Sequence, residues 1–319
     1  HLAPGEYSFW GINKKDSKTA FFASGKQVCS THCTTHEHTG KKHETDLRRI
    51  VDKFNSLYSK VINYSGYSRP LFQEMNVLSE KIIDITRLSY ENNAVRYDEL
   101  RQGKQGALTL MSWDILSRHI EEYLDASNAD IKLLDVGAAG GQGILRAQEY
   151  GYHAYGLDIS ERFVTLLTDN TKILNRDKDH IRKCDSRFID FGSGMFDVVR
   201  QSASLLHIPL IAKGYSCDLA LAESNRVLKE GGLLFISVKK GNGIELQDTG
   251  EGLGVRAFQL FTVDQMVAML QRNGFEPVFF QEFFEQRNAY ETRWLIFIAQ
   301  KIVSHEKKGK LTITTATEA

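Results

Sequence analysis

One stretch, residues 131–160, constrains what this chain can fold into more than any other. It begins with the apolar run IKLLDV, which is typical of a buried strand, and continues into a turn with four glycines between residues 137 and 143. A short helical segment follows, and a second apolar strand ends at Asp158. This order of strand, glycine turn, helix and strand predicts one βαβ unit of a parallel sheet.

The chemistry of this unit predicts a nucleoside-binding site. A glycine turn at a helix N-terminus lets a ligand approach backbone N–H groups closely, and an acid at the end of the second strand, here Asp158, can accept hydrogen bonds from ribose hydroxyls. The spacing does not match the dinucleotide fingerprint G-x-G-x-x-G, because Ala139 stands where the second glycine is required. An NAD site is therefore disfavoured.

The same residues resemble the class I S-adenosylmethionine-dependent methyltransferases. The pattern of that family is two apolar residues, then Asp-x-Gly-x-Gly-x-Gly, with an acidic residue at the end of the second strand. Asp135, Gly137, Gly141 and Asp158 match this pattern, and Ala139 departs from it. A methyl group at position 139 fits the turn if that residue keeps a negative φ.

The resemblance covers residues 132–302 and includes a Lys-x-Gly-Gly turn at 229–232 that is similar to small bacterial members of the family. It implies an α/β fold: a Rossmann-like, seven-stranded, mostly parallel sheet with helices on both faces, in the order 3-2-1-4-5-7-6 with strand 7 antiparallel. Apolar runs predict its strands at 131–136, up to Asp158, and at 180–184, 196–202, 233–238, 276–284 and 293–300.

The residues that precede this region show helical periodicity. Apolar residues at three- and four-residue spacing predict helices at 45–64, 71–88 and 107–124, with a polar link at 91–106. By analogy with such enzymes, we expect these helices to form an N-terminal helical cap that selects the substrate. The predicted organisation is a cap region at 1–126, an S-adenosylmethionine-binding catalytic domain at 127–303 and a loose polar tail at 304–319.

The predicted site residues lie after the strands, because ligands bind outside the carboxyl ends of strands in open α/β sheets. The resemblance implies that Asp185, with Ser186 beside it, accepts a hydrogen bond from the adenine amine; for Asp185 the alternative is a solvated loop position. The predicted contacts of S-adenosyl-L-methionine are Asp135, Gly137, Ala138, Ala139, Gly141, Asp158, Ile159, Asp185, Ser186, Gln201 and Ser202.

A histidine is the predicted catalytic residue. Methyl transfer to a protonated atom requires removal of a proton, and imidazole titrates near neutral pH. His207 follows the fourth predicted strand, where the reacting methyl group should lie, so it is predicted as catalytic and substrate-binding. The alternative is a structural histidine that bonds to backbone at a turn. Arg256, after a glycine-rich loop at 241–254, is the second predicted substrate contact.

A Cys/His-rich tract at residues 29–43 suggests a metal site. Zinc takes four Cys or His ligands, and Cys29, His32, Cys33 and His36 are the predicted set. No second, distant cysteine pair completes a familiar zinc spacing, so a polar surface loop is the alternative.

The composition of the chain disfavours some classes of binding partner. The formal net charge is 0, whereas proteins that grip a nucleic-acid backbone usually carry a basic excess. No apolar run approaches the ~18 residues of a membrane span, the N-terminus lacks a signal pattern, and 4 cysteines in 319 residues do not make a disulfide framework. We therefore expect a cytoplasmic monomer or homodimer without membrane or nucleic-acid partners.

These observations predict an S-adenosylmethionine-dependent methyltransferase that acts on an O, N or C atom of a small-molecule, natural-product or peptide acceptor. The acceptor should lie between the cap and the edge of strands 4 and 5. The position that holds a flipped adenine in amino-directed methyltransferases reads RQSA at 200–203 and lacks their Pro-Pro motif. One alternative is an RNA methyltransferase, favoured only by Lys41, Lys42, Arg48 and Arg49. A non-catalytic scaffold is the third.

Overall fold

The computed structural model describes residues 36–62, 69–101, 107–125, 127–170, 172–175, 179–211, 215–248, 252–287 and 290–303. The chain divides into two compact units, His1–Lys42 and His43–Ala319. Of the predicted zinc ligands, Cys29, His32 and Cys33 lie outside the described residues, as does the predicted tail at 304–319. His36 is described only as the first residue of helix α2 (His36–Ile62).

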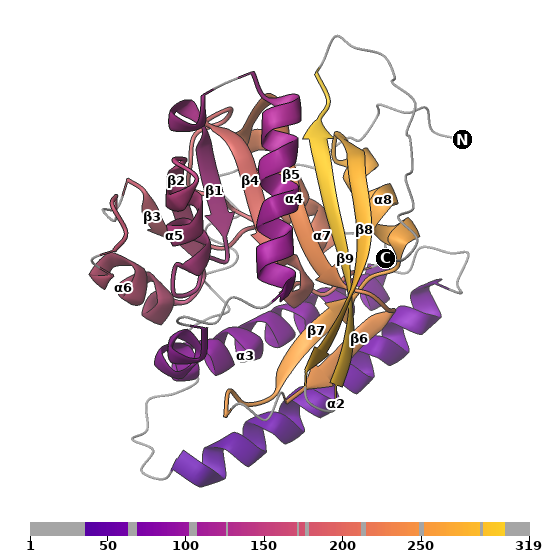
Figure 1. The fold of residues 1–319 in the computed structure, drawn as a ribbon. Helices are drawn as coiled ribbons and strands as arrows, with labels where there is room; N and C mark the ends of the chain where they lie inside the picture. The colour runs from indigo at the N-terminus through magenta and orange to yellow at the C-terminus, as the bar shows by residue number, and fades with distance from the viewer. Residues whose placement is uncertain are drawn as a thin grey trace, which may run out of the picture. The chain divides into compact units, whose positions relative to one another are not determined.

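A seven-stranded sheet forms the centre of the larger unit, in the order β3-β2-β1-β4-β5-β9-β8 (Figure 1). Its first five strands are parallel, whereas β9 runs antiparallel to both β5 and β8. The predicted order, with an antiparallel seventh strand, is confirmed. The strands are β1 (Lys132–Val136), β2 (His153–Asp158), β3 (Ile181–Lys183), β4 (Phe196–Ser202), β5 (Leu228–Lys239), β8 (Phe275–Arg287) and β9 (Tyr290–Lys301).

Helices cover both faces of this sheet, because parallel strands that are apolar on both sides must be buried on both sides. Helix α4 (Ala107–Tyr123) lies in front of the sheet in Figure 1, and α7 (Tyr215–Val227) and α8 (Val263–Arg272) lie behind it. Helices α5 (Gln142–Glu149) and α6 (Glu161–Asp169) connect the first three strands. The strands of the sheet are therefore packed between helices on both faces.

Helix α3 (Arg69–Arg101) is longer than predicted. The expected polar link is wrong for residues 91–101, where the helix continues past a kink at Asn93 (φ −116°, ψ 15°). The Asn93 side-chain amide donates to the carbonyls of Ser89 (2.8 Å) and Leu253 (3.3 Å). Because this amide bonds a helix carbonyl at the kink, the helix bends there without ending.

A second, two-stranded sheet pairs β6 (Gly243–Gln247) with β7 (Arg256–Leu260). Strand β6 lies inside the region that was predicted as a glycine-rich loop, so that prediction is wrong for these residues. The Asn55 side chain on α2 bonds both backbone groups of Ile244, at 2.9 and 3.1 Å. This pair of strands therefore lies beside helices α2 and α3, although the helices and the strands are far apart in the sequence (Figure 1).

One further boundary differs from the prediction. Strand β5 begins at Leu228 and takes in the Lys-x-Gly-Gly turn, because its residues pair with β4 before and after the glycines.

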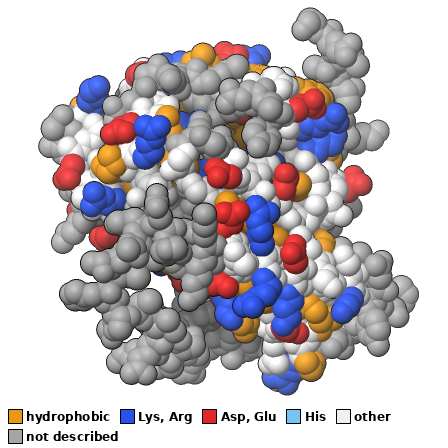
Figure 2. Space-filling view, turned by 90° about the horizontal axis from the view of Figure 1, so that it is seen from below, with side chains coloured by type: hydrophobic (Ala, Val, Ile, Leu, Met, Phe, Trp, Pro, Cys, Tyr) orange, Lys and Arg blue, Asp and Glu red, His pale blue; other side chains and the backbone are white. Residues whose placement is uncertain are grey.

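Charged side chains of both signs lie next to one another on the face that carries α2 and α3 (Figure 2). Arg48 pairs with Glu44 at 2.8 Å and Arg49 with Asp46 at 3.7 Å along α2. Both arginines that favoured RNA binding are therefore partly neutralised by carboxylates one helical turn away.

Candidate functional site

Two cavities lie at the carboxyl ends of β1, β2 and β4, and helix α3 forms part of the wall of each. The first has a volume of about 150 Å³ and reaches Asp158 at the end of β2 and Asp185, which follows β3. The second, of about 280 Å³, reaches the strands β5, β7 and β9. The residues common to both walls are Tyr90, Tyr97, Gly137, Ala139, Ser202, Ala203 and His207.

The glycine turn after β1 is left-handed at Gly137 (φ 75°), Ala139 (φ 46°) and Gly141 (φ 88°). Ala139 therefore does not keep the negative φ at which its methyl group would fit the turn without strain. An L-residue pays about 1–2 kcal/mol for this conformation, and here the Ala139 N–H donates to Asp158 Oδ2 at 3.0 Å. Ala203, after β4, is also left-handed (φ 52°). Both strained alanines line the cavities, and such strain clusters at functional sites.

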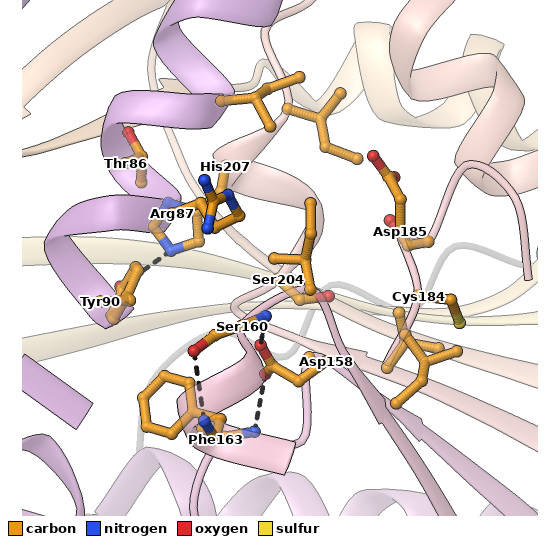
Figure 3. A pocket seen from close by; sticks show the side chains of 18 of the residues that line it. Thr86, Arg87, Tyr90, Asp158, Ser160, Phe163, Cys184, Asp185, Ser204 and His207 are labelled. Atoms are coloured by element: carbon orange, nitrogen blue, oxygen red, sulfur yellow. Dashed lines mark hydrogen bonds between the residues drawn. The ribbon is translucent and has the colours of Figure 1, made fainter. Parts of the chain in front are cut away.

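Asp158 ends β2 with its carboxylate at the first cavity (Figure 3). One oxygen accepts from the Ala139 N–H and the other from the Ser160 N–H, at 3.0 and 2.8 Å. Burial raises the pKa of the Asp158 carboxyl to about 6, even though these two N–H groups stabilise the charged form. A carboxylate has room for about four hydrogen bonds, so Asp158 can still accept from a ligand.

Asp185 lies across the first cavity from Tyr90 and His207 (Figure 3). Its carboxylate is bound by the guanidinium of Arg187, with Nη2 to Oδ2 at 2.7 Å and Nε to Oδ1 at 3.1 Å. The same guanidinium, which is 9% exposed, also donates to Glu80 on α3 at 3.0 Å. Arg187 therefore links the strand-end acid to the helix that covers the cavity.

His207 follows β4 in a short 3-10 turn and is hydrogen-bonded at both ring nitrogens. Nδ1 lies 3.1 Å from the Ala257 carbonyl oxygen, and Nε2 lies 3.0 Å from the Tyr90 hydroxyl. Burial lowers the pKa of His207 to about 3, and the nearby cations Arg256 and Lys239 lower it further. The ring is therefore neutral at physiological pH.

The structure brings most of the predicted site residues to the cavities. The first cavity is lined by Gly137, Ala139, Asp158, Ile159, Asp185, Ser186, Ser202 and His207, and the second by Asp135, Gly137, Ala138, Ala139, Ser202, His207 and Arg256. Asp135 is buried there in an ion pair with Arg200 at 2.7 Å, and burial raises its pKa.

Two predicted contacts line neither cavity. Gln201 is fully buried on the opposite face of β4, where its amide donates to Ser224 on α7 at 2.6 Å. Successive side chains of a strand alternate in direction, so Ser202 faces the cavity and Gln201 cannot. Gly141 is the N-cap of helix α5, and a side chain there would collide with Leu167 and Ile173.

Several wall residues were not predicted. Thr86, Tyr90 and Tyr97 face the cavity from α3, and their spacing of four and seven residues is the helical signal that could have identified them. Lys239 and Trp294 line the second cavity, with the Lys239 ammonium 3.7 Å from the ring centre of Phe258. Their pattern in sequence is that of ordinary strand residues.

Among the residues that the structure describes, no group of three or more His, Cys, Asp or Glu side chains could hold a metal ion. No helix within the described ranges is long and apolar enough to cross a membrane.

Residues 134–236 match the family described as the methyltransferase domain. This part of the chain is similar to that family. The matched segment runs from β1 to β5 and contains the glycine turn, Asp158, Asp185 and His207. The predicted resemblance to class I S-adenosylmethionine-dependent methyltransferases is confirmed.

A relative from Haemophilus influenzae, an uncharacterized protein, is 28% identical over 155 residues, which are 47% of this chain. The match spans 60% of that relative, so the chain covers about three-fifths of its length.

Three solved structures are similar to this chain. The [4+2]-cyclase SpnF superposes with a TM-score of 0.50 at 17% identity, over 70% of this chain and 97% of its own. A SAM-dependent methyltransferase from Methanosarcina mazei gives a TM-score of 0.48 at 21% identity, over 58% and 98% of the two chains. The 1,6-didemethyltoxoflavin-N1-methyltransferase of Burkholderia thailandensis gives 0.42 at 19% identity, over 63% and 93%. SpnF is named as a cyclase, so the shared fold alone does not determine the reaction.

Proposed function

We propose that this protein transfers a methyl group from S-adenosyl-L-methionine to a small-molecule or peptide acceptor. The observation that carries the proposal is the position of Asp158, a buried carboxylate at the end of β2 beside the left-handed glycine turn. That arrangement offers two ribose hydroxyls an acceptor at the place where backbone N–H groups can approach the cofactor.

The residues of the first cavity fit this cofactor. Asp158 would hold the ribose, and Asp185 with Ser186 would accept from the adenine amine. Ser204 Oγ is buried in the same wall and has no hydrogen-bond partner among the described residues. Buried hydroxyls are normally hydrogen-bonded, so this wall is suited to a polar ligand. When bound, the cofactor supplies a methyl group on a positively charged sulfur.

The second cavity would hold the acceptor. Its wall carries the aromatic rings of Tyr90, Tyr97, Phe258 and Trp294 and also many polar and charged side chains, among them Asp98, Arg101, His207, Lys239, Arg256 and Glu285. Aromatic surface beside placed polar groups suits a small acceptor that is itself polar. Helix α3 would then act as the cap over both ligands, which keeps residues 1–126 as the proposed substrate-selecting region and residues 127–303 as the catalytic domain.

Calorimetric titration with S-adenosylhomocysteine tests the proposal directly. We expect 1:1 binding to the purified chain, and loss of that binding in Asp158→Ala. Asp190→Ala is the matched control, because Asp190 is an exposed acid outside both cavities. A wild-type chain that does not bind S-adenosylhomocysteine would contradict the assignment.

RNA as the acceptor receives little support within the described part of the chain, where Arg48 and Arg49 face carboxylates of the same helix. A zinc site with the ligands Cys29, His32, Cys33 and His36 stays a prediction. Elemental analysis of the purified protein for zinc tests it. The cytoplasmic location and the monomeric or homodimeric state also remain proposals.

A further inference from the structure

Tyr90 lies at the junction of the two cavities, and its neighbours determine where its proton points. The ring projects from α3 toward the end of β4 and contacts His207 (Figure 3). Two hydrogen bonds join its hydroxyl to residues far away in sequence: one to His207 Nε2 at 3.0 Å and one from Arg256 Nη1 at 3.2 Å.

The tautomer of His207 follows from its own partners. The Ala257 carbonyl can only accept, so Nδ1 must carry the proton of that 3.1 Å bond. A neutral imidazole has one N–H, and Nε2 is therefore a bare acceptor. The Tyr90 O–H must then donate to His207, and not the reverse.

The Tyr90 oxygen is left with one lone pair. A phenol has one proton and two lone pairs; the proton goes to His207 and one lone pair accepts from the Arg256 guanidinium. No third partner occurs among the described residues. At the cavity junction, Tyr90 can thus accept one more hydrogen bond and cannot donate one.

We propose that Tyr90 binds the methyl acceptor and selects molecules whose reacting nitrogen or oxygen carries a hydrogen. The proposal rests on the methyl-transfer function and deepens it by naming the acceptor class: small aromatic or heteroaromatic molecules with an N–H or O–H group. His207 is a positioning residue that acts through Tyr90. An acceptor that lacks this hydrogen, such as a tertiary amine or a thioether, gives Tyr90 nothing to bind.

The surroundings argue against proton transfer along this chain of hydrogen bonds. Burial raises the pKa of Tyr90 to about 12 and lowers that of His207 to about 3, so both groups keep their resting protonation across the physiological range. Neither Tyr90 nor His207 takes the acceptor's proton, so that proton is released to solvent water when the methyl group has been transferred. The network orients the acceptor and does not serve as the base.

Aromatic rings on the far side of the cavity support a flat acceptor. Phe258 and Trp294 line the second cavity and flank the Lys239 ammonium, at 3.7 and 5.8 Å from their ring centres. The edge of Tyr97 packs against Tyr90 with the ring centres 5.6 Å apart. The Lys239 ammonium lies over the Phe258 ring, so this wall presents a cation beside aromatic rings, and a cation attracts the face of an aromatic acceptor and not an aliphatic group.

The test uses nitrogen-15 NMR of the full chain, with phenol and anisole as probes that differ in one O–H. In wild-type protein we expect the Nδ1–H tautomer at His207 between pH 5 and 9, and a change at Nε2 when phenol is added but not when anisole is added. Tyr90→Phe should weaken phenol binding about fivefold, because one hydrogen bond contributes about 1 kcal/mol. His207→Gln identifies the resonances of His207 and should retain phenol binding, since an amide also accepts from Tyr90.

Tyr152→Phe is the matched control, because Tyr152 is a buried tyrosine outside both cavities. It should leave His207 and phenol binding unchanged. An Nε2–H tautomer, equal responses to phenol and anisole, or no response to phenol at its solubility limit would each overturn the proposal. Titration with S-adenosylhomocysteine separates the two ideas: failure there removes the methyl-transfer function, while the tautomer of the free protein still decides the role of Tyr90.

Discussion

The two walls of the cavities are built in different ways. The sheet wall comes from one contiguous stretch, in which the turn after β1 and the acid at the end of β2 bond each other directly. The helix wall is assembled from α3, β7 and the turn after β4, where Tyr90 meets His207 across 117 positions and Arg256 across 166. In the proposed function, the sheet wall would hold the cofactor through backbone geometry, and the helix wall would select the acceptor through side chains.

The largest effect should come from the sheet wall. We expect Asp158→Ala to weaken S-adenosylhomocysteine binding by about 1,000-fold, since two hydrogen bonds to a charged acceptor contribute about 4 kcal/mol together. Calorimetry measures the loss, and Asp190→Ala should bind like the wild type. Retained affinity in Asp158→Ala would show that the sheet wall is not what holds the cofactor.

The second largest effect should come from Arg187, which links the two walls. Arg187→Met leaves the carboxylates of Asp185 and Glu80 facing each other without their cation, and we expect the free energy of unfolding to fall by about 3 kcal/mol. Urea denaturation measures this. The exposed pair of Arg48 with Glu44 is the control, and Arg48→Met should cost less than about 1 kcal/mol. Equal costs would mean that α3 is not held to the cavity by Arg187.

The pH dependence of S-adenosylhomocysteine binding should depend on the ionisation of Asp158 in the sheet wall. Because the pKa of Asp158 is raised to about 6, its carboxylate is charged above that pH and protonated below it. Affinity for S-adenosylhomocysteine should therefore fall about tenfold between pH 7.5 and 5, measured by calorimetry. The sign for folding is opposite: ionisation of this buried acid lowers stability as the pH rises from about 4 to 6. Asp158→Asn should remove the step, and a step that persists in that variant would assign it to another group.

The smallest effect should come from the strained turn. Ala139→Gly relieves a left-handed alanine at a cost in chain entropy, so we expect a gain of about 0.5 kcal/mol in the free energy of unfolding. Ala138→Gly is the control; Ala138 is buried and is not left-handed, and its replacement should destabilise by about 1 kcal/mol. Urea denaturation of both variants distinguishes them, and destabilisation by Ala139→Gly would mean that the turn stores no strain.

The sequence predicted more of the sheet wall than of the helix wall. The strands, the glycine turn and the placement of Asp158 were predictable from the residues, because an apolar run and a cluster of glycines carry their own local signal. The strand order and the position of Asp185 were predicted from the resemblance to the methyltransferase family. Gln201 was wrongly predicted to face the cofactor, because side chains alternate along a strand and its neighbour Ser202 is the one that faces the cavity. The strand β6 was missed because glycines dominate its surroundings, and polar residues such as Asn92 and Asn93 disguised the second half of α3.

By itself the sequence determined an α/β sheet with a nucleoside-type turn and its acids, since neighbouring residues in the chain build those features and local chemistry suffices. Only the tertiary structure decided that α3 closes over the strand ends, that Arg187 ties Glu80 to Asp185, and that Tyr90 donates its proton to His207. Those contacts join segments that have no local pattern in common. Their partners are chosen by packing, which brings distant side chains within hydrogen-bond reach once the sheet has formed.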